Sequence, residues 1–99
     1  MNWDKFYIIT MDKGGLLDTF DSQKFHNQLT KANGIKAWWH YLESTYIIRV
    51  EFGVTAKNVS DYIRSIAPNK KFFTSELKLD NYNGFLPQEA WDWINNNRK

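Results

Sequence analysis

Four strand-like segments are interrupted by two helix-like segments in this chain of 99 residues, and their order restricts the fold more than any other feature. Residues 5–11 form an apolar, β-branched run that predicts a strand buried on both faces. Residues 46–52 predict a second, mostly buried strand, paired in a hairpin with residues 35–42. Residues 35–42 and 70–79 alternate in polarity, and the former is expected at a sheet edge because polar residues interrupt its second face.

Two amphipathic helices are expected between these strands. The first follows a cap at Ser22 or Asp21, and the second follows a cap at Thr55. Their inner faces carry apolar side chains at spacings of three and four: Phe25, Leu29 and Ala32 in the first helix, and Val59, Tyr62, Ile63 and Ile66 in the second. A short third helix is expected to begin near Pro87, because proline is favoured in the first turn of a helix.

The order strand, helix, strand, strand, helix, strand predicts a ferredoxin-like α+β fold, βαββαβ. In this fold a four-stranded antiparallel sheet has its first and third strands in the middle and both main helices on one face. The short C-terminal helix is an addition to that plan. The length permits one domain and the chain contains no linker or repeat, so we expect residues 1–99 to form a single domain.

Composition narrows the classes of function. The chain has no cysteine, which excludes disulfides, thiolate zinc sites and thiol nucleophiles. It has no apolar run long enough to span a bilayer and no segment that resembles a signal peptide, so we expect a cytoplasmic protein without a membrane partner. A formal charge of +2 is too small to indicate nucleic-acid binding by itself.

The sheet face opposite the two main helices is expected to meet water, a ligand or a second subunit. Alternation leaves open which side chains occupy it; the outward candidates are Trp38, His40 and Leu42 on one strand and Phe72 and Thr74 on another. An apolar patch of this kind forms a dimer interface more often than a ligand site. We therefore expect a homodimer with Trp38 and Phe72 in its interface. A small-molecule sensor is the lesser alternative, which would need a pocket that the sequence does not reveal.

Two tryptophans of the last helix are further interface candidates. Trp91 and Trp93 stand two positions apart, so their side chains leave the helix in different directions. The helix is therefore expected to contact its own subunit, a second copy, or both.

Asp12 is the candidate catalytic and metal-binding residue. It stands at the end of the first predicted strand, and Lys13 and two glycines follow it. One carboxylate at this point can bind Mg²⁺, and a two-fold dimer would bring two copies together. The alternative is that Asp12 caps the turn of residues 12–15 through its side chain.

Lys13 and His40 are the candidates for contact with phosphate. A packed strand histidine is the alternative for His40, and His26 is expected to be a solvated helix residue. Ser44 has no adjacent base motif and no glycine-rich phosphate loop follows a strand, so neither a hydrolase triad nor nucleotide-dependent transfer has support.

Three segments resemble a known group of proteins: residues 37–46 (AWWHYLESTY), residues 84–93 (GFLPQEAWDW) and residues 7–12 (YIITMD). They resemble small bacterial proteins of the SinR family, which look like distant relatives of the second CRISPR adaptation protein (Cas-two) and of the VapD toxins. The likeness covers most of the chain, and the two segments rich in tryptophan are its more specific part.

This resemblance implies a ferredoxin-like homodimer associated with nucleic acid. In those relatives the acidic residue that ends the first strand is implicated in Mg²⁺-dependent hydrolysis of phosphodiester bonds, and Asp12 is the matching position here. The first hypothesis is thus a dimeric, Mg²⁺-dependent endonuclease that acts on RNA or DNA. The alternative is a non-catalytic module that binds nucleic acid or a protein partner in a defence, toxin or phage-related system.

Overall fold

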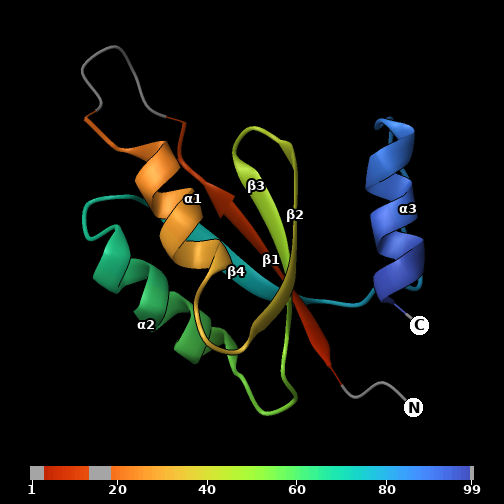
Figure 1. Ribbon diagram of the computed structural model, residues 1–99, viewed down its shortest axis with the longest axis horizontal. Coiled ribbons are helices and arrows are strands. Elements are labelled where there is room, and N and C mark those ends of the chain that lie inside the picture. Colours follow the sequence, from red (N-terminus) through yellow and green to blue (C-terminus); the bar gives the residue numbers. More distant parts are fainter. Residues whose placement is uncertain (1–3, 14–18, 99) are drawn as a thin grey trace.

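The computed structural model describes residues 4–13 and 19–98, which form one antiparallel sheet and three helices (Figure 1). The elements are β1 (Lys5–Met11), α1 (Ser22–Thr30), β2 (Ile35–Leu42), β3 (Thr45–Val50), α2 (Ala56–Ile66), β4 (Phe72–Leu77) and α3 (Gln88–Asn97). The strand order β2-β3-β1-β4 places β3 and β1 in the centre, which confirms the predicted ferredoxin-like fold. No helix in the described part is both long and apolar enough to cross a membrane.

Local signals explain where α1 and α2 begin. The Asp21 side chain accepts a hydrogen bond from the Lys24 backbone N–H at 3.0 Å, which satisfies one of the free donors of the first turn of α1. Thr55 and Asn58 form a capping box at the start of α2. Beyond the end of α1, Gly34 has a φ of +89°, a conformation that glycine adopts without steric cost.

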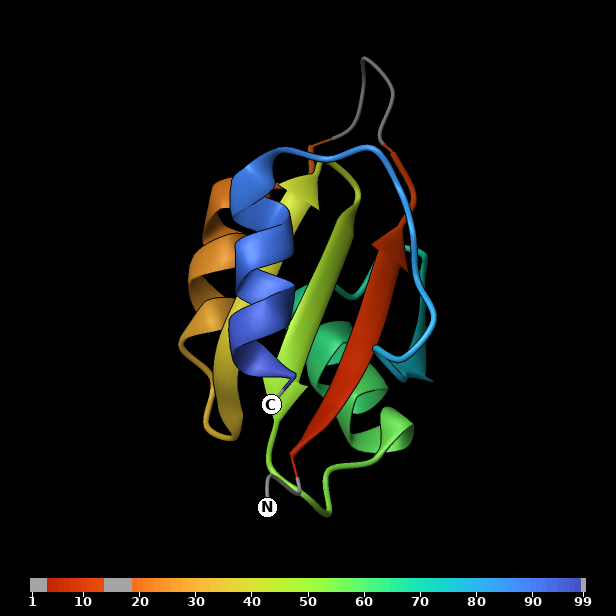
Figure 2. The same cartoon turned by 90° about the vertical axis from the view of Figure 1, so that its right-hand side faces the viewer.

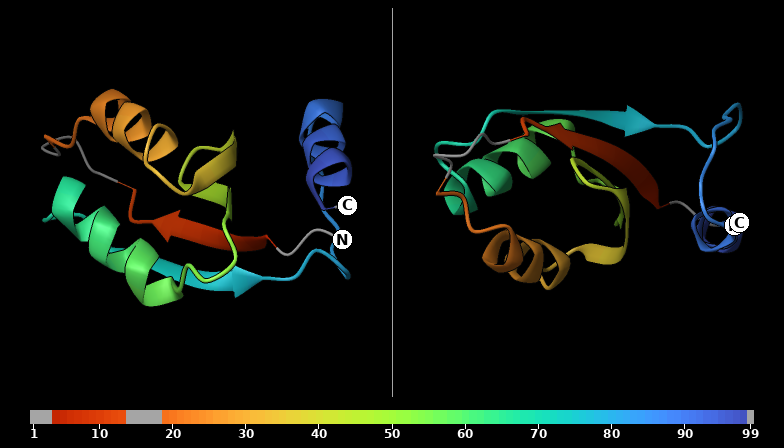
Figure 3. Two further views of the ribbon diagram at one scale, coloured as in Figure 1. Left: turned by 60° about the horizontal axis from the view of Figure 1, so that its bottom comes forward. Right: turned by 90° about the horizontal axis from the view of Figure 1, so that it is seen from above.

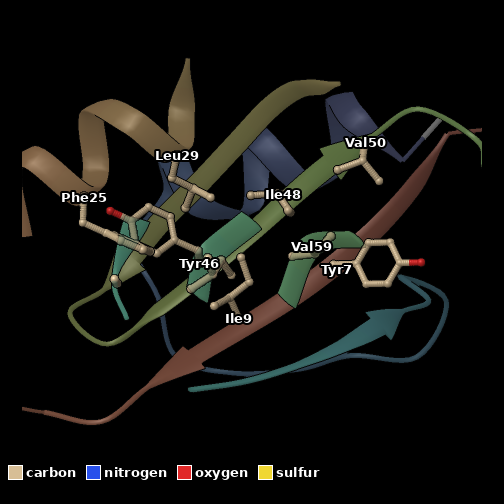
Figure 4. Close-up of a cluster of buried hydrophobic side chains, with 10 residues drawn as sticks. Tyr7, Ile9, Phe25, Leu29, Tyr46, Ile48, Val50 and Val59 are labelled. Atoms are coloured by element: carbon tan, nitrogen blue, oxygen red, sulfur yellow. The ribbon is translucent and has the colours of Figure 1, made fainter. Parts of the chain in front are cut away.

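The main hydrophobic core lies between the sheet and the pair α1 and α2, which cover the same face (Figure 3). Figure 4 shows Phe25 and Leu29 of α1 reaching toward the central strand β3. The core consists of buried side chains from the central strands and both helices: Tyr7, Ile9, Phe25, Leu29, Tyr46, Ile48, Val50, Val59, Ile63 and Ala67. These include most of the apolar positions expected on the inner faces of the helices.

A second, smaller core lies on the opposite face of the sheet, beneath α3. Figure 2 shows α3 in front of β2, with the ribbon of β1 in open view beside it. The buried members are Phe6, Trp39, Ile47, Ala90 and Ile94. The indole N–H of Trp39 donates to the Ala90 carbonyl oxygen at 3.2 Å. The last helix therefore packs on the sheet of its own subunit.

The C-terminal end of α3 lies against the sheet, where the helix continues to Asn97. The Asn97 side chain donates to the Trp93 carbonyl oxygen at 2.9 Å and accepts from Arg49 at 3.3 Å. Arg49 in turn pairs with Asp4 at 2.8 Å, and Lys36 reaches the same carboxylate at 3.1 Å.

This ion-pair network sets the charge state of Asp4. Burial acts to raise the pKa of the Asp4 carboxyl, but hydrogen bonds and charge from Lys36 and Arg49 outweigh it, so that this pKa lies below its usual value. The Asp4 carboxyl is therefore ionised at neutral pH, where it pairs with Arg49. Arg49 in turn links the sheet to Asn97 at the end of α3.

The edge strand β2 departs from simple alternation. Its pairing with β3 shifts register between Ile35 and Ala37 and again between Trp39 and Leu42. Trp38 pairs opposite Ile48, whose side chain faces α1 and α2, whereas Leu42 pairs opposite Thr45 on the α3 side.

Of the outward candidates, Leu42 lies on the face opposite α1 and α2 as expected, whereas the prediction is wrong for Trp38, His40, Phe72 and Thr74. Trp38 and His40 contact the ring of His26 on α1, and Phe72 packs against the main core. The irregular register of β2 separates Leu42 from the other two side chains of its strand.

Candidate functional site

A pocket of about 520 Å³ lies where β1 ends, between the start of α1 and the β2–β3 hairpin. We call it the α1 pocket. Its lining is mainly polar and comes from segments far apart in the chain: Met11, Asp12, Lys13, Phe20, Ser22, Gln23, Phe25, His26, His40, Glu43, Ser44, Tyr46 and Lys70. Asp12, Lys13 and His40, the three residues singled out in the sequence for metal or phosphate contact, all belong to it.

Asp12 lies at the mouth of the α1 pocket. Its backbone N–H donates to the Lys71 carbonyl oxygen at 2.9 Å, which fixes the end of β1 against the segment before β4. Its side chain is exposed and makes no hydrogen bond or ion pair with another described residue. The alternative role of Asp12 in a turn involves residues 14–15, which lie outside the described part of the chain.

Lys13 forms an ion pair with Glu43 of the β2–β3 turn, with 3.3 Å between the Nζ and Oε2 atoms. Both side chains are largely exposed, so water screens the pair and it contributes at most about 1 kcal/mol to stability. An incoming phosphate can therefore displace Glu43 from Lys13 at little cost.

The carboxylates near the pocket decide how well it suits Mg²⁺. Among residues 4–13 and 19–98 there is no cluster of three or more histidine, aspartate or glutamate side chains placed to hold a metal ion. Mg²⁺ is commonly held by one or two carboxylates together with water and substrate phosphate, so Asp12 suits it chemically. Among the described residues two carboxylates line the pocket, Asp12 and Glu43, and Glu43 is paired with Lys13. A further carboxylate could come from the Asp12 of a second copy.

His26 departs from its expected role as a solvated helix residue. Its Nδ1 atom lies 2.7 Å from the Tyr46 hydroxyl, and its ring meets the Trp38 ring edge-on at 4.7 Å. The position of His26 offered a signal, because it stands directly after Phe25 and one turn before Leu29. It therefore borders the buried face of α1.

His40 is held on two sides within the sheet. Its Nδ1 atom lies 3.0 Å from the Thr45 carbonyl oxygen, and its ring stacks on Tyr46 at 3.9 Å with the planes 2° apart. His40 is therefore packed against its strand neighbour and also borders the α1 pocket.

Tyr46 connects the two histidines and was overlooked as a functional residue, because alternation marks it only as a core position. Its side chain is 2% exposed, and burial raises the pKa of its phenol to about 12. The hydroxyl thus stays protonated at physiological pH and keeps its hydrogen bond with His26.

The four predicted interface residues fall into two groups. Trp38 is 42% exposed on the edge strand, whereas Phe72 is half-buried against the main core. Trp91 and Trp93 are half-buried and pack on the second core, with the Trp93 ring edge-on to Phe6 at 6.1 Å. An interface role for each of the four stays a prediction.

A row of residues crosses the α3 side of the sheet at the end where β1 finishes. The strand pairing aligns Leu42, Thr45, Thr10 and Phe73 across the four strands. The two apolar side chains at its ends are well exposed, 48% for Leu42 and 65% for Phe73. We call these four residues the exposed row.

No family model, no curated protein and no solved structure matches this chain. Its fold and site define a ferredoxin-like α+β protein with a polar pocket lined by two histidines at one end of the sheet. The resemblance to the SinR, Cas-two and VapD proteins therefore stays a prediction.

Proposed function

We propose that this protein is a homodimer that acts on nucleic acid at the α1 pocket, as a Mg²⁺-dependent endonuclease with Asp12 as the metal ligand. One observation carries the proposal: Asp12 and Lys13 from the end of β1 and His40 from β2 line a single pocket. The resemblance of residues 7–12 to the strand ends of the nuclease relatives points to the same carboxylate.

The roles in the pocket follow from the chemistry of each group. Asp12 would hold Mg²⁺, and the metal would activate water and offset charge on the phosphate. Lys13 would turn from Glu43 to a phosphate oxygen. His40, held at Nδ1 by the Thr45 carbonyl, has its Nε2 atom left for contact with phosphate.

The exposed row suggests how two copies would meet. Thr10 belongs to this row and Asp12 follows two residues later on the same strand end. A two-fold contact through Leu42 and Phe73 would cover exposed apolar surface and bring both Asp12 residues toward one axis. Sedimentation of the wild-type protein and of Phe73→Ser would test this contact, with a larger monomer fraction expected for the variant.

Asp12→Asn is expected to remove cleavage while leaving the fold and the dimer intact, because the side chain is exposed and nearly isosteric with asparagine. The expected loss is about 100-fold or more, the usual effect of removing an electrostatic stabiliser of a transition state. Size-fractionated protein would be incubated with labelled single- and double-stranded RNA and DNA, in Mg²⁺ and in EDTA.

Asp80→Asn is the matched control for this assay, since Asp80 is exposed in the segment between β4 and α3 and does not line the α1 pocket. It should cleave at the wild-type rate. Equal cleavage by Asp12→Asn and wild type would contradict a metal-binding role for Asp12.

The second candidate function is non-catalytic binding of nucleic acid, and the exposed indole of Trp38 favours it. Trp38 stands beside His26, which lines the α1 pocket, and an unpaired base could stack on its exposed indole. Trp38→Ala is expected to weaken binding of single-stranded RNA or DNA in EDTA by about ten-fold, since one stacked base contributes roughly 1–3 kcal/mol. Fluorescence anisotropy would measure the affinity.

Phe85→Ala is the control for binding, because Phe85 is a fully exposed aromatic in the segment before α3 and lies outside the α1 pocket. Equal affinities of the Trp38 and Phe85 variants would exclude Trp38 as the stacking platform. If the protein neither cuts nor binds nucleic acid, both candidates are wrong and a protein partner for the exposed row is the function to test.

A further inference from the structure

We propose that His26 and His40 form an acid–base pair that cleaves RNA without a metal ion, through attack of the ribose 2′-hydroxyl on the adjacent phosphorus. The inference rests on the proposed function only in requiring that nucleic acid enters the α1 pocket. It names RNA as the substrate, because DNA has no 2′-hydroxyl.

The two histidines both line the α1 pocket, His26 from α1 and His40 from β2. Their ring centroids lie 6.1 Å apart and both rings line the α1 pocket. They are the only histidines of the chain. Cleavage of this type needs one group to take a proton from the attacking oxygen and another to give a proton to the leaving oxygen.

His40 suits the role of base because its partner determines which nitrogen is protonated. The Thr45 carbonyl oxygen can only accept a hydrogen bond, so Nδ1 of His40 carries the proton that it donates at 3.0 Å. In the neutral ring, Nε2 is then the unprotonated atom. The stack on Tyr46 keeps the ring in this orientation when Nε2 gains a proton.

His26 suits the role of acid because its partner tolerates both charge states. The Tyr46 hydroxyl oxygen can accept a hydrogen bond from Nδ1–H of a protonated His26 at 2.7 Å. The same bond persists after Nε2 has given up its proton. Because burial raises the pKa of the Tyr46 phenol to about 12, Tyr46 is a weak acid and does not replace His26 as the proton donor to the leaving group.

The step balances within the pocket. The His40 Nε2 atom takes the 2′-hydroxyl proton, the freed oxygen bonds to phosphorus, and the bond from phosphorus to the 5′-oxygen breaks as that oxygen takes the Nε2 proton of His26. The products are a 2′,3′-cyclic phosphate and a 5′-hydroxyl end. Exchange of protons with water returns both histidines to their starting states, and the step consumes neither metal nor redox partner.

Charged side chains of both signs line the pocket. Lys13 and Lys70 line the same pocket and supply positive charge near the phosphate. The remaining titratable groups that line it are Asp12, Glu43 and Tyr46. An acid and a base acting together predict a bell-shaped dependence of the cleavage rate on pH.

The test uses the size-fractionated full chain, a labelled single-stranded RNA, and the same RNA with 2′-deoxy residues, all in EDTA. The wild type should cut only the RNA and leave a cyclic phosphate. His26→Gln and His40→Gln should each slow cleavage about 100-fold or more. Lys31→Gln, an exposed change at the end of α1 outside the pocket, should have no effect.

A substrate with sulfur in place of the leaving 5′-oxygen separates the two roles, because a thiolate leaves without being protonated. His26→Gln should regain the wild-type rate on this substrate, whereas His40→Gln should stay slow. This rescue also shows that the His26 variant is folded, since a misfolded variant would fail on both substrates.

The outcomes separate this inference from the proposed function. Cleavage that needs Mg²⁺, is lost in Asp12→Asn and persists in both histidine variants would overturn the histidine pair and leave the proposed function standing. Cleavage in EDTA that survives Asp12→Asn and is lost in both histidine variants would support the pair and contradict the metal mechanism. RNA that is bound but stays uncut in EDTA would also overturn the pair.

Discussion

Replacement of Trp39 by alanine should lower the free energy of unfolding by about 3–5 kcal/mol, the usual effect of removing a buried tryptophan. The Trp39 side chain is 3% exposed and lies in the second core with Phe6, Ile47 and Ile94. Its indole N–H also donates to the Ala90 carbonyl oxygen of α3. The variant loses both the packing and the bond that hold α3 on the sheet. Urea unfolding followed by far-UV circular dichroism would measure the loss.

The neighbouring tryptophan is the matched control. Trp38 differs by one position, lies on the opposite face and is 42% exposed, against 3% for Trp39. Trp38→Ala should therefore lower stability by no more than about 1 kcal/mol. Trp39→Phe should fall between the two, at about 1–3 kcal/mol, because it leaves the Ala90 carbonyl without its indole donor. Equal losses for Trp38→Ala and Trp39→Ala would contradict the packing of α3 on its own sheet.

A rise in pH from 10 to 12 should remove roughly 2 kcal/mol of stability through Tyr46 alone, because the slope reaches at most about 1.4 kcal/mol per pH unit between the two pKa values. Burial raises the pKa of the Tyr46 phenol to about 12 in the folded chain, against 10.0 for the free side chain. The unfolded chain therefore loses this proton first as the pH rises. The contribution is fully present below pH 10 and is lost as the pH approaches 12.

Tyr46→Phe isolates this effect from the other groups that titrate in the same range. At pH 7 the variant should be less stable by about 1 kcal/mol, because it lacks the hydrogen bond to His26. Between pH 10 and 12 the wild type should lose its advantage and become the less stable protein. Urea unfolding of both proteins across this range measures the crossing, and parallel stability curves would show that the Tyr46 phenol ionises freely in the folded chain.

The fold was predictable because its signals are local. The periods of the apolar residues identified the four strands and two main helices, and the caps at Asp21 and Thr55 appear as predicted. Asp12, Lys13 and His40 were also found from the sequence, through the strand end and the resemblance, and they line one pocket. Their chemical roles stay predictions.

The wrong predictions for β2 concern the faces of its side chains, because strand register decides which face each of them occupies. Strict alternation grouped Trp38, His40 and Leu42 on one face, and the shift in the pairing of β2 with β3 between Trp39 and Leu42 separated Leu42 from the other two. At the end of α3, Asn97 accepts a hydrogen bond from Arg49 of β3, a partner that no pattern within α3 reveals.

The sequence by itself determined the elements, their order and the central place of β1 and β3, because apolar period, capping and turn residues act over a few neighbouring positions. Only the tertiary structure decided that α3 packs on its own sheet and that His26, His40 and Tyr46 meet in one pocket. These contacts join residues from separate elements, and their distances depend on strand register and helix placement. Such contacts leave no periodic trace in the chain, which is why the candidate acid–base pair emerged from the structure.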